Sequence, residues 1–230
     1  MNGEGSYMAP EVVVVGKQYT APNQVDLTIV RKMMSISRGN FGVTDTNGNI
    51  MFKVKGKVMS LRTRRVLLDA AGTPIVSFQK KIMSMHSTWK VYRGDSNDSK
   101  DLLFTVRKSS LFQFKTQLDV FLASNTSKDN RDFKIKGSWF EKSCTIYAGN
   151  SSTVIAQMHK KHSFSSFVLG KDKFAVTVYP HVDYAFITAL VVILEEINEE
   201  GKNNGGGGSN FGGASGGGGG GGGGCGGGAS

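Results

Sequence analysis

Apolar and polar residues alternate with a period of two along much of the chain. In the run from residue 50 to 55, three apolar side chains would face one side of an extended strand and two lysines the other. The apolar residues are Ile50, Phe52 and Val54, and the lysines are Lys53 and Lys55. The same alternation recurs over residues 112–120, 133–136 and 174–178. Strands that are apolar on one face only are typical of antiparallel sheets.

Glycine-containing turns separate these apolar runs. Residues 45–48 and 69–72 share the form Asp-x-x-Gly, and the sequence YAGN at 147–150 precedes another apolar run. A glycine in such a turn can adopt the positive φ that a tight hairpin requires. Together with the alternation, these glycine-containing turns predict about a dozen short strands joined mostly by hairpins.

One segment breaks the alternation. Residues 184–194 are apolar on every side, Asp183 stands where a helix N-cap is expected, and Pro180 shortly precedes it. Eleven residues of helix span about 16 Å, roughly half the hydrocarbon thickness of a bilayer, so a transmembrane helix is not expected. A helix that is apolar all round must instead be surrounded by protein. The side chains expected to form its buried surface are Tyr184, Phe186, Ile187, Leu190, Val191 and Leu194.

The strands and the helix together predict one architecture. Strands that are apolar on one face must bury that face, and a helix that is apolar on all sides must be surrounded by other side chains. A sheet that closes into a barrel around the helix meets both needs. The predicted fold is therefore mainly β: a closed antiparallel barrel of about twelve strands around a buried hydrophobic C-terminal helix.

Changes in composition divide the chain into three segments. Residues 1–24 lack a long periodic pattern and are predicted to be a weakly ordered N-terminal arm. Residues 25–200 have the expected size of a single domain and are predicted to form the barrel. Residues 201–230 are mostly glycine and have almost no apolar surface, which predicts a disordered tail.

The charge and the cysteines bear on partners and location. A formal net charge of +10 indicates acidic partners, namely phospholipid headgroups, nucleic acid or acidic proteins, with a merely solubilising charge as the alternative. Two cysteines, Cys144 and Cys225, cannot build a disulfide framework, which favours a reducing compartment. The N-terminal residues do not follow the pattern of a secretory signal. We expect a monomeric cytoplasmic protein; peripheral attachment at the plasma membrane and a nuclear location both stay open.

Several motifs carry a likeness to a known family. They are VRKMMS at residues 30–35, RVLLD at 65–69 followed by GTP at 72–74, KGSW at 136–139, and VYP at 178–180 followed by VDYAF at 182–186. Over residues 20–200 the chain resembles the plant LURP-one-related family. The resemblance implies a Tubby-like fold, with twelve strands around a central hydrophobic helix, and kinship with the Tubby C-terminal domain and the phospholipid scramblases. It also implies membrane tethering, phosphoinositide binding, a link to transcription and an association with plant defence.

Candidate catalytic and metal sites are weak. His159 and His162 are three residues apart but lie in a predicted strand and loop without neighbouring acidic or thiol ligands. The scramblase kinship points to calcium near Asp172, yet Phe174 and Val176 occupy positions where oxygen ligands would be needed. Cys144 lies in an apolar strand pattern, where a packed thiol is expected rather than a nucleophile. We therefore expect no catalytic residue, no metal site and no cofactor.

Paired basic residues are the remaining candidates for a binding site. Lys53 and Lys55 share one strand face, as do Lys134 and Lys136, and residues at this spacing lie roughly 7 Å apart. Such a pair can bracket a phosphorylated headgroup, although a solvated strand face is the plainer interpretation. A further basic cluster in a predicted loop consists of Arg62, Arg64 and Arg65.

Three functional hypotheses follow. The first is a non-enzymatic module that docks on anionic lipids or phosphoinositides and so tethers a signalling protein to a membrane. The second is a nuclear, transcription-associated or protein-interaction domain, supported by the net charge and the short basic runs. The third, scramblase-like lipid transfer, fits poorly because the apolar helix is too short to span a bilayer.

Overall fold

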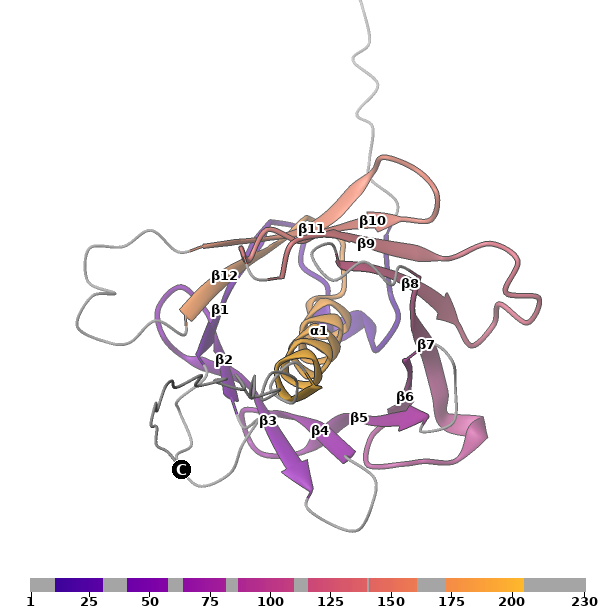
Figure 1. Cartoon of the computed structure of the whole chain (residues 1–230). Coiled ribbons are helices and arrows are strands. Elements are labelled where there is room, and N and C mark those ends of the chain that lie inside the picture. The colour runs from indigo at the N-terminus through magenta and orange to yellow at the C-terminus, as the bar shows by residue number, and fades with distance from the viewer. Residues whose placement is uncertain are drawn as a thin grey trace, which may run out of the picture.

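Twelve strands close into one antiparallel barrel that surrounds an α-helix (Figure 1). The computed structural model describes residues 11–30, 41–57, 64–81, 87–109, 116–139, 141–160 and 173–204, and its strands and helices lie within these ranges. The strands are β1 (Val25–Val30), β2 (Phe41–Thr44), β3 (Ile50–Lys57), β4 (Arg64–Asp69), β5 (Pro74–Lys81), β6 (Thr88–Arg93), β7 (Leu102–Lys108), β8 (Thr116–Leu122), β9 (Phe133–Gly137), β10 (Thr145–Ala148), β11 (Val154–Lys160) and β12 (Lys173–Val178). The helix is α1 (Tyr184–Asn204), and two short 3₁₀ helices are η1 (Lys17–Tyr19) and η2 (Ser99–Asp101).

The connectivity of the barrel is simple. Each strand pairs with its neighbours in the sequence, and β1 pairs with β12 to close the ring. At the closure Val25 lies opposite Val178 and Leu27 lies opposite Val176, so apolar residues meet on the inner face. Closure leaves no sheet edge with unpaired backbone groups. The fold class predicted from the alternation is confirmed.

The two Asp-x-x-Gly turns form as predicted. Gly48 has φ +87° and Gly72 has φ +97°, a region that residues with a Cβ rarely adopt. In the first turn the Asp45 carboxylate accepts the N–H of Asn47 at 2.9 Å and that of Asn49 at 2.8 Å. The side-chain amide of Asn49, which donates to Asp45 Oδ2 at 2.9 Å, and these backbone hydrogen bonds hold the pKa of Asp45 below its ordinary value. Local side-chain chemistry therefore fixes the turn between β2 and β3.

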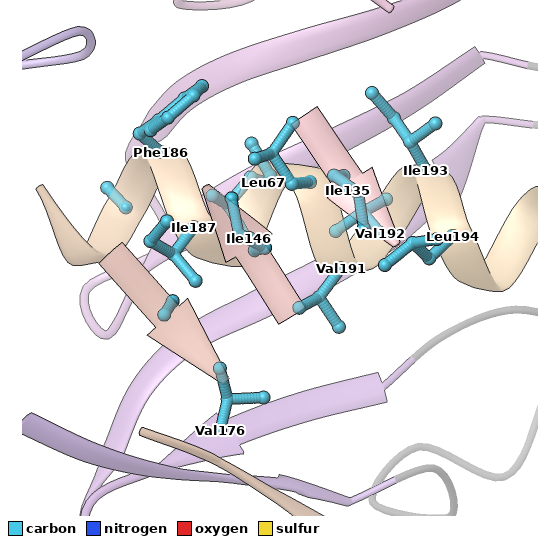
Figure 2. Packing of buried hydrophobic residues seen from close by; sticks show 14 of the residues in the cluster. Leu67, Ile135, Ile146, Val176, Phe186, Ile187, Val191, Val192, Ile193 and Leu194 are labelled. Atoms are coloured by element: carbon cyan, nitrogen blue, oxygen red, sulfur yellow. The ribbon is translucent and has the colours of Figure 1, made fainter. Parts of the chain in front are cut away.

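The helix fills the interior of the barrel (Figure 2). Five of the six residues predicted as its buried surface are almost completely enclosed, and Tyr184 at its start is half-buried. The Phe186 ring packs against Phe104 of β7 and Phe133 of β9, with centroid distances of 5.1 and 4.9 Å. The enclosed helix residues are Phe186, Ile187, Leu190, Val191 and Leu194.

The helix is longer than the apolar run that predicted it. It covers 21 residues, Tyr184–Asn204, rather than the eleven of the apolar segment. Glu195, Glu196 and Asn198 continue the helix and are also buried. The prediction ended the helix where the apolar run ends because charged residues usually mark solvent. Here the wall of the barrel surrounds the next turn as well.

Asp183 holds the start of the helix. Its carboxylate is fully buried and accepts the N–H of Phe186 at 2.9 Å, which is the predicted N-cap. The other carboxylate oxygen accepts three N–H groups of the N-terminal segment, from Val14 at 3.2 Å, Val15 at 2.7 Å and Gly16 at 3.0 Å. Burial raises the pKa of Asp183, and these hydrogen bonds act in the opposite direction.

The N-terminal arm therefore differs from the expectation over residues 11–24. Val12 forms a parallel bridge with Val182, and both Val12 and Val15 are buried. The arm is held by this single bridge and by the carboxylate of Asp183, and neither contact leaves a periodic pattern in its sequence. Residues 1–10 of the predicted arm and residues 205–230 of the predicted tail lie outside the described residues.

The enclosure of the helix by the barrel can be tested by placing a charge on a buried helix residue. Leu190→Asp should prevent folding, because Leu190 is completely buried and an unpaired charge there costs several kcal/mol out of a total stability of about 5–15 kcal/mol. Val13→Asp is the matched control, since Val13 is 44% exposed and should tolerate the charge. Circular dichroism during heating measures whether each variant unfolds cooperatively. A cooperatively folded Leu190→Asp protein would contradict the helix enclosed by the barrel.

The role of Asp183 can be tested in the arm itself. Asp183→Asn replaces one acceptor oxygen by an NH₂ group, so it cannot serve the helix cap and three arm N–H groups together. We expect the amides of Val14, Val15 and Gly16 to exchange with solvent at least tenfold faster, which is a local loss of about 1.4 kcal/mol or more. Unchanged exchange at these amides would show that the arm is held by packing alone.

Candidate functional site

Four basic residues lie on or beside the outer face of β7 to β9. In antiparallel pairing, residues directly opposite each other lie on the same face of the sheet. Arg107 lies opposite Asp119, Asp119 lies opposite Lys134, and Lys136 occupies the next outward position on β9. We use the name basic face for Arg107, Arg131, Lys134 and Lys136.

The acidic group within this row is already engaged. Arg131 Nη1 lies 2.6 Å from Asp119 Oδ1, and Arg131 Nε donates to Asn150 Oδ1 at 2.6 Å. Asp119 therefore balances one of the four positive charges. Arg107 is exposed, with its guanidinium carbon 5.2 Å from the centroid of the Phe121 ring, and Lys136 is exposed as well. The basic face keeps an excess of positive charge.

Lys134 occupies the centre of the basic face. It points outward, since Phe133 and Ile135 face the core, but its side chain is only 9% exposed instead of solvated as expected. Its Nζ lies 5.1 Å from the centroid of the Tyr147 ring. Burial lowers the pKa of Lys134, the positive charges of Lys136 and Arg131 lower it further, and the negative charge of Asp119 partly opposes them. A bound anion would relieve this repulsion.

The second predicted lysine pair has a different setting. Lys53 and Lys55 lie on the outer face of β3, opposite Leu68 and Val66 of β4. Lys53 is half-buried and its Nζ donates to the carbonyl oxygen of Ala70 at 2.7 Å, whereas Lys55 is exposed. Apolar neighbours and an internal hydrogen bond make this pair the weaker anion site.

The predicted arginine loop is corrected in part. Arg64 and Arg65 begin strand β4, so alternation sends them to opposite faces, and Arg62 lies outside the described residues. Arg65 is 5% exposed and its Nε lies 2.5 Å from Glu196 Oε1 of the helix. The assignment of Arg65 to a headgroup site is therefore wrong.

Arg64 stays on the outside of the barrel but is held by a neighbouring loop. Its Nη2 lies 3.0 Å from Asp95 Oδ1 and donates to the carbonyl oxygens of Asp95 at 2.6 Å and Ser96 at 3.1 Å. These contacts tie β4 to the connection between β6 and β7. Arg64 therefore contributes less free charge than the exposed arginine and lysine of the basic face.

Burial argues against Cys144 as a nucleophile. Cys144 is completely enclosed, and burial raises the pKa of its thiol to about 12, so it is not a thiolate nucleophile at neutral pH.

Within the described ranges no three His, Cys, Asp or Glu side chains gather as a metal site. His162 and Asp172 lie outside those ranges. No helix of the described part is long and apolar enough to cross a membrane.

Two members of the basic face were missed by the sequence analysis. Arg107 stands in an alternating run, Leu102–Lys108, and Arg131 precedes β9 by two residues. Each is the only basic residue on its stretch of the outer face, so neither forms an i, i+2 pair. Strand pairing, not spacing along the chain, brings them beside Lys134 and Lys136.

The buried ion pair between Arg65 and Glu196 can be tested for a structural role. Arg65→Ala should lower the free energy of unfolding by about 3–5 kcal/mol, because Glu196 would keep its charge in a buried place without this partner. The double variant Arg65→Met, Glu196→Leu should regain most of that loss. Urea unfolding measures both. An equal free energy of unfolding for Arg65→Ala and the wild type would show that the ion pair does not stabilise the fold.

Comparisons with known proteins agree with the observed fold. The LURP-one-related family model matches residues 25–195. Protein LURP-one-related 15 of Arabidopsis thaliana is 56% identical over 188 residues, covering 82% of this chain and 87% of that protein. Protein LURP1 of the same plant is 47% identical over 192 residues, covering 84% and 93%. A crystal structure of an Arabidopsis thaliana protein is 48% identical, has a TM-score of 0.66, and covers 81% of this chain and 98% of its own. The chain thus belongs to the LURP-one-related family.

Proposed function

We propose that the chain is a non-enzymatic module that docks on anionic membrane lipids through the basic face. The observation that carries this proposal is the charge imbalance around Lys134. Burial, Lys136 and Arg131 lower the pKa of Lys134, and Asp119, which is paired with Arg131, partly opposes them. A bound anion would favour the charged form of Lys134 and so compensate this net effect.

The dimensions of the basic face suit a phosphorylated headgroup. Lys134 and Lys136 are two residues apart on one strand, so they lie roughly 7 Å from each other, and Arg107 is two strands away, at about 10 Å from Lys134. Several phosphate oxygens could therefore be contacted together. A phosphoinositide, which carries more than one phosphate, is the lipid that uses all of these cations.

The filled interior directs binding to the outside of the barrel. Barrels that hold a small ligand usually do so inside, where side chains leave a cavity. Here the inward residues of the strands and the helix form one cluster of buried apolar side chains, among them Leu67, Ile135, Ile146 and Leu190. This cluster supports a protein that binds at its surface rather than an enzyme with an enclosed site.

The wider role follows from the family resemblance. It implies a signalling function associated with plant defence, and docking would hold such a signal at the cytoplasmic face of a membrane. The helix supports scramblase-like lipid transfer poorly, because it is enclosed by the barrel. A nucleic acid or an acidic protein would be attracted by the same charges, and the binding test separates these partners.

Charge reversal tests the docking proposal. Lys134→Glu with Lys136→Glu should weaken binding to phosphatidylcholine vesicles containing phosphatidylinositol bisphosphate by well over tenfold, since each lysine near an anionic surface contributes on the order of 1 kcal/mol. Because Lys134 is mostly covered, Arg107→Glu with Lys136→Glu is the second variant, and both of its positions are exposed. Vesicle sedimentation measures the affinity.

Lys53→Glu with Lys55→Glu is the matched control on another face of the barrel and should lose much less. Raising the salt concentration should mimic the reversal at the basic face, because screening acts over about 10 Å at 0.1 M. Wild-type protein that ignores anionic vesicles at low salt, or double variants of the basic face that bind like the wild type, would leave an acidic protein or nucleic acid as the partner.

A further inference from the structure

Ser109 stands at the rim of the barrel directly after two basic residues. It follows Arg107 and Lys108 at the end of β7, and its side chain is exposed. Its N–H donates to the carbonyl oxygen of Gln117 at 3.0 Å, and its Oγ donates to the same oxygen at 3.1 Å. The hydroxyl is therefore held at the surface, beside the outer face of β8.

The pairing of three strands places this hydroxyl next to the basic face. Gln117 of β8 lies opposite Lys136 of β9, so Ser109, Gln117 and Lys136 form one row across the sheet. Neighbouring strands are about 4.8 Å apart, which puts Ser109 about 10 Å from Lys136 between Cα atoms. Arg107 is two residues before Ser109 on the same outward face, at roughly 7 Å. Both long basic side chains can reach a phosphate group on Ser109.

We propose that Ser109 is a phosphorylation site, and that its phosphate contacts Arg107 and Lys136 and so weakens docking of the basic face on anionic lipids. The modification site stands on the sequence and geometry of β7. The effect on docking rests on the function proposed above. A serine kinase that selects basic residues before its acceptor would recognise Arg107 and Lys108.

The chemical step is a phosphoryl transfer from ATP. A bond forms between Ser109 Oγ and the γ-phosphorus, and the bond from that phosphorus to the β,γ-bridging oxygen breaks. The hydroxyl proton passes to the catalytic base of the kinase, and ADP leaves. Access to Ser109 and to the two basic residues before it requires the end of β7 to detach from β6 and β8, and strand ends open at low free energy.

The charge of the phosphate explains the effect on docking. A phosphoserine carries about −1.5 to −2 charges at pH 7 and three strong acceptor oxygens. Its contacts with Arg107 and Lys136 would occupy two of the three cations that Asp119 does not balance. The same charge would repel the lipid phosphates. We expect binding to anionic vesicles to weaken by about 10- to 30-fold, as for the loss of two basic residues near the surface.

The site itself is tested without lipid. The full chain is incubated with ATP, Mg²⁺ and a serine kinase that selects arginine two residues before its acceptor, and phosphate is located by mass spectrometry. We expect modification of Ser109 in the folded wild type and none at this position in Ser109→Ala. A peptide of residues 103–113 serves as the reference substrate. If the kinase does not phosphorylate the peptide, or phosphorylates the peptide but not the folded chain, Ser109 is not the proposed modification site.

The position of the phosphate is tested by its own titration. Contacts with Arg107 and Lys136 should hold the second pKa of the phosphoserine below its ordinary value of about 6, because cations favour the dianion. In phosphorylated Lys136→Gln the pKa should rise again. Phosphorus NMR measures both values. Equal pKa values in the two proteins would refute the contact.

The effect on docking is tested with a matched charge. Ser109→Glu and phosphorylated wild type should bind vesicles of phosphatidylcholine and phosphatidylinositol bisphosphate at least tenfold more weakly than unmodified protein. Ser99→Glu is the control, since Ser99 is exposed at the opposite end of β7, more than about 20 Å away. Unmodified protein that does not bind would refute the proposed function and with it the regulation, while leaving the modification site standing. Unmodified protein that binds no better than its phosphorylated form would refute the regulation alone.

Discussion

An α-helix that is apolar on every side cannot face water, and the rest of this structure follows from enclosing it. Phe186 and Leu190 are fully buried, and the inner faces of twelve strands supply the surrounding surface. Each strand can then keep its other face in water. Closing the sheet between β1 and β12 removes its edges at the same time. The helix and the barrel therefore bury each other's apolar surfaces.

Polar contacts at two places along the helix fix its position inside the apolar interior of the barrel. At its start, Asp183 accepts one N–H of the helix and three of the N-terminal segment. In its second half, Glu196 pairs with Arg65 of β4. A purely apolar interior would permit the helix to slide or rotate at small cost, whereas a displaced buried carboxylate would lose its partners. These contacts give the packing its register.

Because apolar side chains fill the interior, the proposed binding site lies on the outer surface of the barrel. The alternation that sends Phe133 and Ile135 inward sends Lys134 and Lys136 outward, so the core and the basic face come from the same strand. Antiparallel pairing then adds Arg107 from a strand further along the sheet. Strand pairing holds these charges at defined spacings, as the docking proposal requires.

The sequence alone determined the strands, the turns and the enclosed helix, because period-two alternation, Asp-x-x-Gly turns and an all-apolar segment are local signals. It also identified the Lys134–Lys136 pair. Tertiary structure decided what depends on contacts between distant residues. It placed Arg65 inside, attached the N-terminal segment to Asp183, and brought Arg107 beside Lys136. Spacing along a strand shows which residues share a face, but only strand pairing shows which charges meet across it.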